Sequence, residues 1–505
     1  MAALIQRYAL IVMTQGKAHE VVRMGSKAAA VKEKDRWSFT TPIEIVEAHS
    51  AEDDMVIPRK HELIHFQACE FGRQAQAGEF VLPGVVIDQF VTSLLQGDPL
   101  WSRSSIVPDN PCHDDRTAIA DEFRPGEPPA KSQSVNQDKM PSDASTEIEL
   151  AEVGVVELPL RLASGEFNAT VLAVTIVRLT SRAGVVGYGY AYAWNKASAQ
   201  ALKVLLLDMS RNLVGLSVHA RADMEAMIRR EYTNMLGSRG MAMHGLSALD
   251  IAMWDCACNG LDLPVQTLLG GDRGLVPAYV SGAGLRPEPA AAASAASALV
   301  SKYSLPALKM WVSSGNVARE VQRVAAVREI IGPDCKLLLD AVKRYTVRDA
   351  IKLAEAVRQY DIEWLEDPLE PALVWRGLAS VSANSPVPIA TGEDCYDVDD
   401  WKRLLDLEAA DIVLVDLQRV GGVSGWRTVE GLCRAAGVGL STHHFPHLGV
   451  RLIAASPRGV FVEYRPWWDE IFGTLNVSNG KLVVASSPGV CPTPILHVEY
   501  ESANG

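Results

Sequence analysis

Residues 335–446 decide the fold of this chain; they begin CKLLLDAVKRYT, pass through EWLEDP (363–368) and TGED (391–394), and end GLSTHHFP (439–446). The stretch holds five short leucine-rich or β-branched runs, at 336–341, 362–368, 387–394, 411–417 and 438–444. Near their ends these runs carry, in order, Asp340, Glu366, Glu393, Asp416 and His443. The spacing of about 25 residues fits one strand, one helix and two short loops. Polar residues repeated at the ends of parallel strands indicate the mouth of a (β/α) barrel.

Eight strand-like runs are expected in a barrel domain at 276–465, the further three being 277–282, 307–312 and 460–465. Helices are predicted between them at 287–302, 317–331, 347–360, 375–383, 398–408 and 426–436. Between the seventh and eighth strands only a short turn is expected, at 448–457, with the C-terminal tail 466–505 replacing the last helix. In that tail, 481–485 is predicted to be a strand that returns to the preceding domain.

The preceding domain is predicted at 148–275. Alternating runs at 147–160, 171–179 and 185–192 indicate a small antiparallel meander, and helical patterns follow at 197–213, 219–231 and 241–258. An α+β domain, joined by the tail 466–505, fits this order.

The first 147 residues are poorly patterned, and 108–145 is rich in Pro, Asp, Ser and Gln. Such a segment buries too little apolar surface to offset its ordering entropy. Two interpretations stay open: synthesis starts near Met140, or the extension is genuine and loosely ordered. No function is assigned to it.

Composition narrows the class of protein. With 505 residues, 48% of them hydrophobic, and a net charge of −13, the chain is typical of an acidic globular protein and unlike one that binds nucleic acid or anionic membranes. No apolar run is long enough to span a bilayer, and the N-terminus is a poor signal peptide. The eight cysteines are scattered, so a reduced, cytoplasmic protein is expected.

Three carboxylates, Asp340, Glu366 and Glu393, end three successive strands of the predicted barrel. For any one of them, a helix N-cap or a loop bridge is an equally good interpretation. Three together at one rim would repel each other strongly without a cation. All-oxygen ligation favours Mg²⁺, or Mn²⁺, over zinc, and open positions would remain for an anionic substrate.

His443 follows one strand after Asp416, and this spacing indicates a dyad in which Asp416 holds Nδ1 and leaves Nε2 as the base. Taken alone, His443 could also be a core histidine, which is the less favoured interpretation. Lys309, on the second strand, would neutralise negative charge that develops on the substrate. Glu463, ending the eighth strand, would hydrogen-bond the substrate carboxylate if protonated.

The patterns LLLDA, WLEDP, TGED, VDLQRVGGVSGW, GLSTHHF and FVEYR, with SALDIAMWD and LPVQTLLGG upstream, resemble the enolase superfamily and its mandelate racemase subgroup. The resemblance runs from about residue 148 to about residue 490. It implies an α+β capping domain on a (β/α)₇β barrel, a modified TIM barrel. It further implies that Asp340, Glu366 and Glu393 bind Mg²⁺ and that His443 and Asp416 remove a proton α to a carboxylate.

The departures from the subgroup pattern limit the reactions that this chain is expected to catalyse. Many members carry Lys-x-Lys on the second strand, where this chain has Lys309-Met310-Trp311. Trp311 cannot exchange protons, so a base is missing on one face and racemisation is disfavoured. After Asp340, the chain has Val342 where Asn is frequent, followed by Lys343 and Arg344, which would reach a distal substrate anion or lie in a solvated loop.

The resemblance therefore implies a Mg²⁺-dependent lyase that dehydrates an aldonic or aldaric acid to a 2-keto-3-deoxy acid. Specificity is expected in the capping domain, at Arg161, Glu166, Phe167, Tyr190 and Trp194, with Trp311, Lys343 and Arg344 on the barrel; surface or packing roles are the alternative. An epimerase or cycloisomerase of the same superfamily, and a non-catalytic acid-binding barrel, stay open. Related proteins suggest a homo-oligomer.

Overall fold

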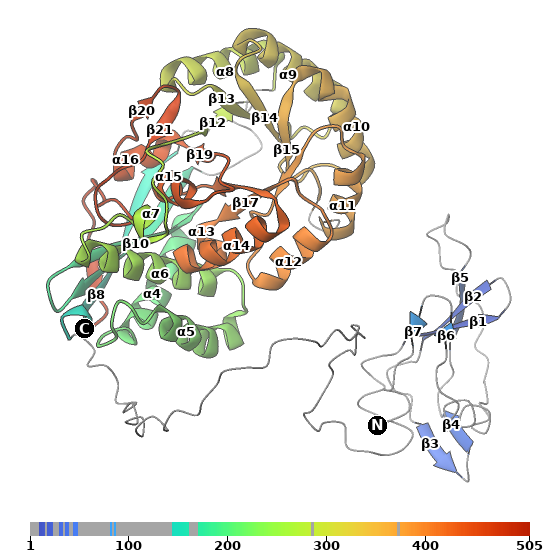
Figure 1. Ribbon diagram of the computed structural model, residues 1–505, viewed down its shortest axis with the longest axis horizontal. Coiled ribbons are helices and arrows are strands. Elements are labelled where there is room, and N and C mark those ends of the chain that lie inside the picture. The colour runs from blue at the N-terminus through green and yellow to red at the C-terminus, as the bar shows by residue number, and fades with distance from the viewer. Residues whose placement is uncertain are drawn as a thin grey trace, which may run out of the picture. The chain divides into compact units, whose positions relative to one another are not determined.

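The computed structural model describes residues 144–160, 170–283, 287–370 and 374–504, together with the backbone of short strands between residues 10 and 86 (Figure 1). The chain divides into two units, Met1–Ala130 and Lys131–Gly505. In the first unit the assigned strands pair antiparallel as β1-β2-β5, β3-β4 and β6-β7. Their bounds are β1 Leu10–Gln15, β2 Ala18–Arg23, β3 Ala30–Glu33, β4 Arg36–Phe39, β5 Glu44–Ala48, β6 Val81–Leu82 and β7 Val85–Val86. The rest of the predicted extension, up to residue 143, lies outside the described residues.

The second unit contains a parallel barrel. Within the described residues its strands follow the order β18-β17-β16-β15-β14-β13-β12-β19, and Leu440 of β18 forms an isolated bridge with Gly459, which precedes β19. The strands are β12 Ala278–Ala283, β13 Ala307–Trp311, β14 Lys336–Asp340, β15 Ile362–Glu366, β16 Ile389–Thr391, β17 Ile412–Asp416, β18 Gly439–His443 and β19 Val462–Tyr464.

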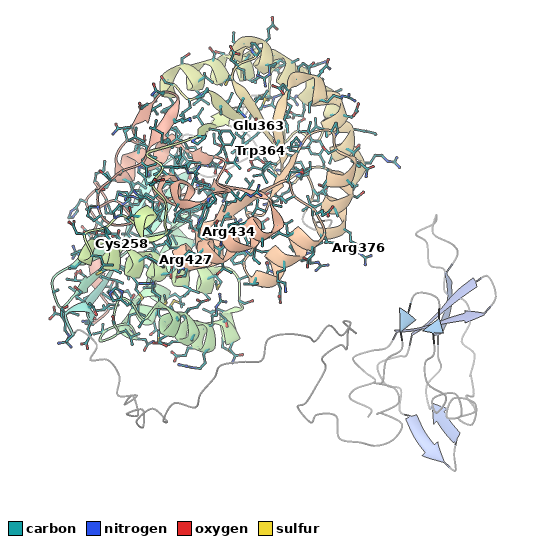
Figure 2. The ribbon with its side chains drawn as sticks, in the orientation of Figure 1. Cys258, Glu363, Trp364, Arg376, Arg427 and Arg434 are labelled. Atoms are coloured by element: carbon teal, nitrogen blue, oxygen red, sulfur yellow. The ribbon has the colours of Figure 1, made fainter. Side chains whose placement is uncertain are left out.

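Helices lie outside this ring of strands (Figure 1). They are α8 Pro289–Tyr303, α9 Val317–Ile331, α10 Val347–Val357, α11 Val374–Asn384, α12 Val398–Asp406, α14 Gly422–Ala436 and α15 Pro446–Ala455. Each helix turns an apolar face to the strands; in α10, for example, Ala350, Leu353, Ala354 and Val357 are all buried. Side chains from alternate positions of the strands fill the barrel, including Leu338, Trp364 (labelled in Figure 2) and Leu414.

The connection between the seventh and eighth strands was predicted wrongly. It is not a short turn but the helix α15, which starts with Pro446 at its first turn. Almost every residue of α15 is buried, including Leu448, Leu452 and Arg451. A helix that is covered on all sides has no polar face, so its sequence lacks the period of an amphipathic helix.

The capping domain is built on an antiparallel sheet of order β10-β9-β8-β22. Its strands are β8 Ile148–Pro159, β9 Val171–Ser181, β10 Val186–Ala193 and β22 Tyr500–Ser502, and its helices are α4 Lys196–Arg211, α5 Arg221–Leu236 and α6 Met241–Gly260. Helix α6 packs on β10, and it also contacts α13 (Leu417–Val420) and α14 of the barrel. The predicted fold class, a (β/α)₇β barrel with an α+β capping domain, is confirmed.

The tail returns to the capping domain by a different strand from the one predicted. The predicted strand at 481–485 is β21 Lys481–Val483, which pairs with β11 (Leu275–Val276) and β20 (Val477–Ser478). Strand β22 joins the capping sheet by pairing with β8. The short helices α7 (Val265–Leu268) and α16 (Asp469–Phe472) complete this region. None of the helices in the described ranges is long and apolar enough to cross a bilayer.

Candidate active site

The acidic residues of the mouth continue the rows of side chains that fill the barrel. Residues two apart in a strand point to the same side, and Leu338, Trp364 and Leu414 lie inside the ring. Two positions further on, these strands end in Asp340, Glu366 and Asp416. In the same way Lys309 lies two positions after the interior residue Ala307, and Glu463 lies two positions after Phe461. The sheet therefore delivers a layer of charged groups directly above an apolar layer, at the C-terminal ends of the strands.

Lys309 lies at the centre of this layer and is completely buried. Its Nζ lies 2.6 Å from Glu366 Oε1, 2.8 Å from Glu463 Oε1 and 3.3 Å from Asp340 Oδ2. Burial favours a neutral amine, but Glu366 and Glu463 outweigh it and raise the pKa of Lys309 well above its usual range. The ammonium ion is therefore retained between three carboxylates.

Glu393 lies beyond the end of β16, after Gly392, whose φ of +127° turns the chain. Its carboxylate lies 2.7 Å from Lys343 Nζ and 3.2 Å from His443 Nε2. Lys343 also contacts Asp394 at 2.6 Å and Asp367 at 3.4 Å. This lysine thus belongs to the acidic rim of the mouth, where its ammonium group offsets neighbouring carboxylates.

The donor chemistry of Asp340, Glu366 and Glu393 suits a hard divalent cation. Burial raises the pKa of Glu366 well above its usual range, and the carboxylate of Asp340 adds to this while Lys309 opposes it. A divalent cation would relieve that repulsion. With their present side-chain positions, no three Asp, Glu, His or Cys side chains in the described residues converge tightly enough to hold an ion. Lys309 contacts Asp340 and Glu366, whereas Lys343 contacts Glu393.

The predicted histidine–aspartate pair is present at the ends of β17 and β18. His443 Nδ1 lies 2.7 Å from Asp416 Oδ2, and the two residues are opposite each other in the paired strands. Although burial opposes ionisation, the hydrogen bond from His443 and the charge of Arg419 lower the pKa of Asp416. Asp416 is thus an anion that holds Nδ1, and Nε2 points toward Glu393 and the mouth.

The prediction that Glu463 binds substrate in its protonated form does not fit the structure. Burial favours the neutral acid, but Arg465 and Lys309 outweigh it and lower the pKa of Glu463 well below its usual range. Arg465 Nη2 lies 2.8 Å from Glu463 Oε1, and the other oxygen accepts the backbone N–H of His444. Glu463 is therefore an ionised support for Lys309 and for the backbone beside His443.

The predicted substrate-binding residues fall into three groups. Arg161, Glu166 and Phe167 lie outside the described residues. Tyr190 is fully buried among Phe445, Trp468 and Phe472, with ring centroids 4.6–5.3 Å apart, so its position does not fit a contact with substrate. The others remain predictions: Trp194, half-buried beside Tyr192 and His444; Trp311, ending β13; Lys343; and exposed Arg344.

Sequence reasoning missed Arg419, Arg465 and the contact of Tyr192 with Asp416. Arg419 Nη1 lies 2.7 Å from Asp394, and it follows Asp416 within the same motif. Arg465 stands two positions after Glu463, so the alternation of the strand would have pointed to it. Tyr192 donates to Asp416 from another domain, 224 residues away, and no local pattern signals such a contact.

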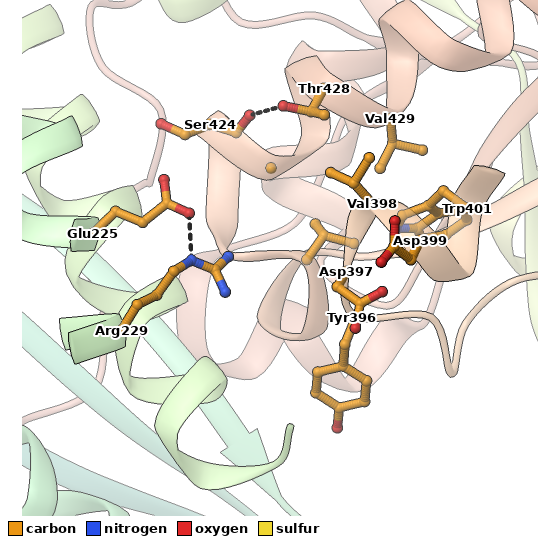
Figure 3. Close-up of a pocket in the computed structure, with 12 residues that line it drawn as sticks. Glu225, Arg229, Tyr396, Asp397, Val398, Asp399, Trp401, Ser424, Thr428 and Val429 are labelled. Carbon is orange, nitrogen blue, oxygen red and sulfur yellow. Dashed lines mark hydrogen bonds and ion pairs between the residues drawn. The ribbon is translucent and has the colours of Figure 1, made fainter. Parts of the chain in front are cut away.

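A cavity of about 390 Å³ is lined by residues from α5 of the capping domain and from the barrel helices α12 and α14. Figure 3 shows its lining, in which Glu225 and Arg229 pair at 2.7 Å, and Asp397 and Asp399 lie on the opposite side of the cavity. It contains no part of the His443–Asp416 pair, so the mouth remains the candidate active site.

The capped barrel and its mouth define the class of enolase-fold enzymes. Residues 145–270 match the family model for the mandelate racemase / muconate lactonizing enzyme N-terminal domain, and residues 291–493 match the enolase C-terminal domain-like model. The chain belongs to the mandelate racemase / muconate lactonizing enzyme family of the enolase superfamily.

Relatives of the chain are named for different activities. The chain is 28% identical to L-talarate/galactarate dehydratase of Salmonella typhimurium, over 64% of this chain and 80% of that protein. It is 30% identical to a D-galactonate dehydratase family member of Catenulispora acidiphila, over 63% and 81%. It is 29% identical to 3,6-anhydro-alpha-L-galactonate cycloisomerase of Streptomyces coelicolor, over 61% and 85%. A crystal structure of the Salmonella dehydratase, liganded with Mg and L-lyxarohydroxamate, superposes with a TM-score of 0.65 at 26% identity, over 70% of this chain and 94% of that one.

Proposed function

We propose that this protein is a Mg²⁺-dependent sugar-acid dehydratase, a lyase that converts an aldonate or aldarate to a 2-keto-3-deoxy acid. The observation that carries the proposal is the 2.7 Å contact between His443 Nδ1 and Asp416 Oδ2, which leaves Nε2 facing the mouth. The fold, the family and the dehydratases among its relatives support the same reaction class.

The proposed cation site consists of Asp340, Glu366 and Glu393. When bound there, Mg²⁺ would supply positive charge beside the substrate carboxylate and so make the adjacent C–H bond more acidic. The chain's own cation, Lys309, adds fixed positive charge beside Asp340 and Glu366. The acids would bind the cation, and the cation and Lys309 together would provide the positive charge that attracts an anionic substrate.

The proton steps are assigned to His443. Its Nε2 takes the proton from the carbon α to the carboxylate, and the electrons of that C–H bond form a carbon–carbon double bond as the β-hydroxyl departs. The imidazolium returns the proton to the leaving oxygen, so that water is released. The resulting enol becomes the 2-keto acid. One base on one face suffices for this sequence, which agrees with Trp311 standing where a second lysine is frequent.

A library of acid sugars, assayed for 2-keto acid with Mg²⁺ and without it, tests the proposal. Turnover should require the metal, and His443→Asn should reduce it at least about 100-fold, the lower range for loss of a general base. Undiminished dehydration by His443→Asn would refute the assignment of the base.

A cycloisomerase or epimerase is the second candidate, because the relatives include two cycloisomerases and an epimerase. Incorporation of deuterium at the α-carbon in D₂O, measured beside the keto-acid assay, separates the two. Exchange without keto acid would favour this second candidate. Binding of acids with neither exchange nor turnover would point to a non-catalytic barrel.

A further inference from the structure

A tyrosine of the capping domain touches the catalytic pair. Tyr192 lies near the end of β10, is 4% exposed, and its hydroxyl lies 3.2 Å from Asp416 Oδ2. The same oxygen accepts from His443 Nδ1 at 2.7 Å, while Asp416 Oδ1 accepts the backbone N–H of Gln418 at 2.9 Å. The carboxylate of Asp416 is therefore held by three donors, and one of them comes from a different domain.

The rest of Tyr192 fixes the position of this hydroxyl. Its backbone N–H donates to Gln418 Oε1 at 2.9 Å, so β10 is bonded both to the last residue of β17 and to the segment that follows that strand. Its ring stacks on His444 with centroids 4.6 Å apart, and His444 in turn contacts the ring of His443 edge-on at 4.6 Å. Ser247 of α6 adds a further link by donating to Leu417 O at 2.7 Å. Docking of the capping domain thus determines where the phenol lies.

We infer that Tyr192 is a positioning residue, through which the capping domain orients Asp416 and so the proton-accepting face of His443. The inference rests on the proposed role of His443 as the base. Asp416 can hold the imidazole in one orientation only if its own carboxylate does not rotate, and the hydroxyl of Tyr192 restrains the oxygen that receives Nδ1–H. Burial and the charge of Asp416 keep the phenol protonated, so it serves as a donor.

Tyr192→Phe removes the hydroxyl and keeps the ring, the backbone bond and the stacking. Tyr190→Phe is a matched control: it lies on the same strand and is fully buried, and its hydroxyl has no hydrogen-bond partner in the part of the chain that the structure describes. On a substrate found by the library screen, Tyr192→Phe should lower kcat about 10- to 100-fold, the effect of losing one hydrogen bond to a charged group, and leave KM within about threefold. Tyr190→Phe should leave both constants close to wild type.

A second measurement needs no substrate. The proton on His443 Nδ1, shared with Asp416, should give a far-downfield proton NMR signal, assigned by its loss in His443→Asn. Tyr192→Phe should shift this signal, because Asp416 Oδ2 then accepts one bond fewer, and Tyr190→Phe should leave it in place. Thermal melts of both variants report on folding.

The outcomes are distinct. A lower kcat and a shifted signal in Tyr192→Phe alone support the inference. Wild-type kcat with an unshifted signal overturns it, as does an equal loss of kcat and melting temperature in both variants, which would indicate packing only. If His443→Asn keeps full activity, the proposed function fails instead, whatever Tyr192→Phe does.

Discussion

Lys309 is a fully buried cation surrounded by three carboxylates, so its removal should affect stability as well as activity. Lys309→Met would leave Asp340, Glu366 and Glu463 without their shared ammonium group. We expect a loss of about 3–5 kcal/mol in the free energy of unfolding, because uncompensated buried charge is costly. Denaturant unfolding checks this, and Mg²⁺ should restore part of the loss.

The control for this change is Lys336→Met. Lys336 stands at the opposite end of the neighbouring strand and pairs with Glu363 at the surface. Its removal should change the free energy of unfolding by less than about 1 kcal/mol. A loss of that small size for Lys309→Met as well would contradict the assigned role of the buried ammonium group.

Lys343 contacts Glu393, Asp367 and Asp394 at the proposed cation site. A fixed positive charge within a few ångströms of a divalent cation repels it strongly at the low effective dielectric of a partly buried site. We therefore expect Lys343→Met to bind Mg²⁺ about tenfold more tightly or better, as titration calorimetry without substrate would measure. Lys336→Met again serves as control, and its affinity should match wild type. Weaker binding by Lys343→Met would mean that Lys343 helps to shape the site.

At the scale of elements, strand β10 approaches helix α6 so closely at Gly189 that there is no room for a side chain at this position. A Cβ added to Gly189 would lie 2.0 Å from Ala248 O and 2.6 Å from Ala252 N of α6. Because both contacts are backbone atoms, neither can move aside without shifting the helix. Gly189→Ala should therefore destabilise the protein by about 3 kcal/mol, in the upper range for overpacking. It should also lower kcat, since β10 carries Tyr192.

Gly431→Ala is the control at this scale. Gly431 lies within α14, and a Cβ there would meet no atom within 4 Å. Alanine is the better helix former, so this variant should match or exceed wild-type stability by up to about 1 kcal/mol. Equal melting temperatures for Gly189→Ala and wild type would show that the sheet and helix can separate without penalty.

At the scale of the whole molecule, Asp255 joins three segments that are distant in sequence. From α6, its carboxylate accepts backbone N–H groups of Tyr188 at 2.8 Å, Val490 at 2.6 Å and Cys491 at 3.0 Å. Burial raises its pKa from 3.8 to about 6, although these three hydrogen bonds oppose the change. The folded state therefore binds a proton more tightly than the unfolded chain.

The sign of the pH effect follows from this difference. Between about pH 4 and pH 6 the folded state carries more protons at Asp255, so its contribution to stability falls as pH rises. Buried His244 and His447, whose pKa burial lowers to about 4, act in the opposite direction. We therefore compare wild type with Asp255→Asn, in which this group cannot titrate. The free energy of unfolding of wild type minus that of Asp255→Asn, the stability gap, should be about 2 kcal/mol larger at pH 4.5 than at pH 7. Urea unfolding at both pH values measures it, and an unchanged gap would refute the raised pKa.

Much of the barrel could be predicted because its signal is local. Several strands carry a charged residue two positions after an interior one, as with Leu338 and Asp340 or Leu414 and Asp416. The helix α15 was not predicted, because a helix that is buried on all sides lacks the polar face by which an amphipathic helix is recognised. Strand β22 escaped because three residues carry too little pattern, and only pairing with β8 makes them a strand.

By itself, the sequence determined that acids, a lysine and a histidine end successive parallel strands, since strand period and spacing act over a few residues and force those side chains to one rim. Only the tertiary structure decided which charges meet there. Lys309 contacts Glu366 and Glu463, and Lys343 contacts Glu393. Glu463 is ionised, and the hydroxyl of Tyr192 donates to Asp416. The physical reason is that such contacts depend on how the strands close into a ring and how the capping domain docks on it. Those arrangements depend on packing between segments hundreds of residues apart.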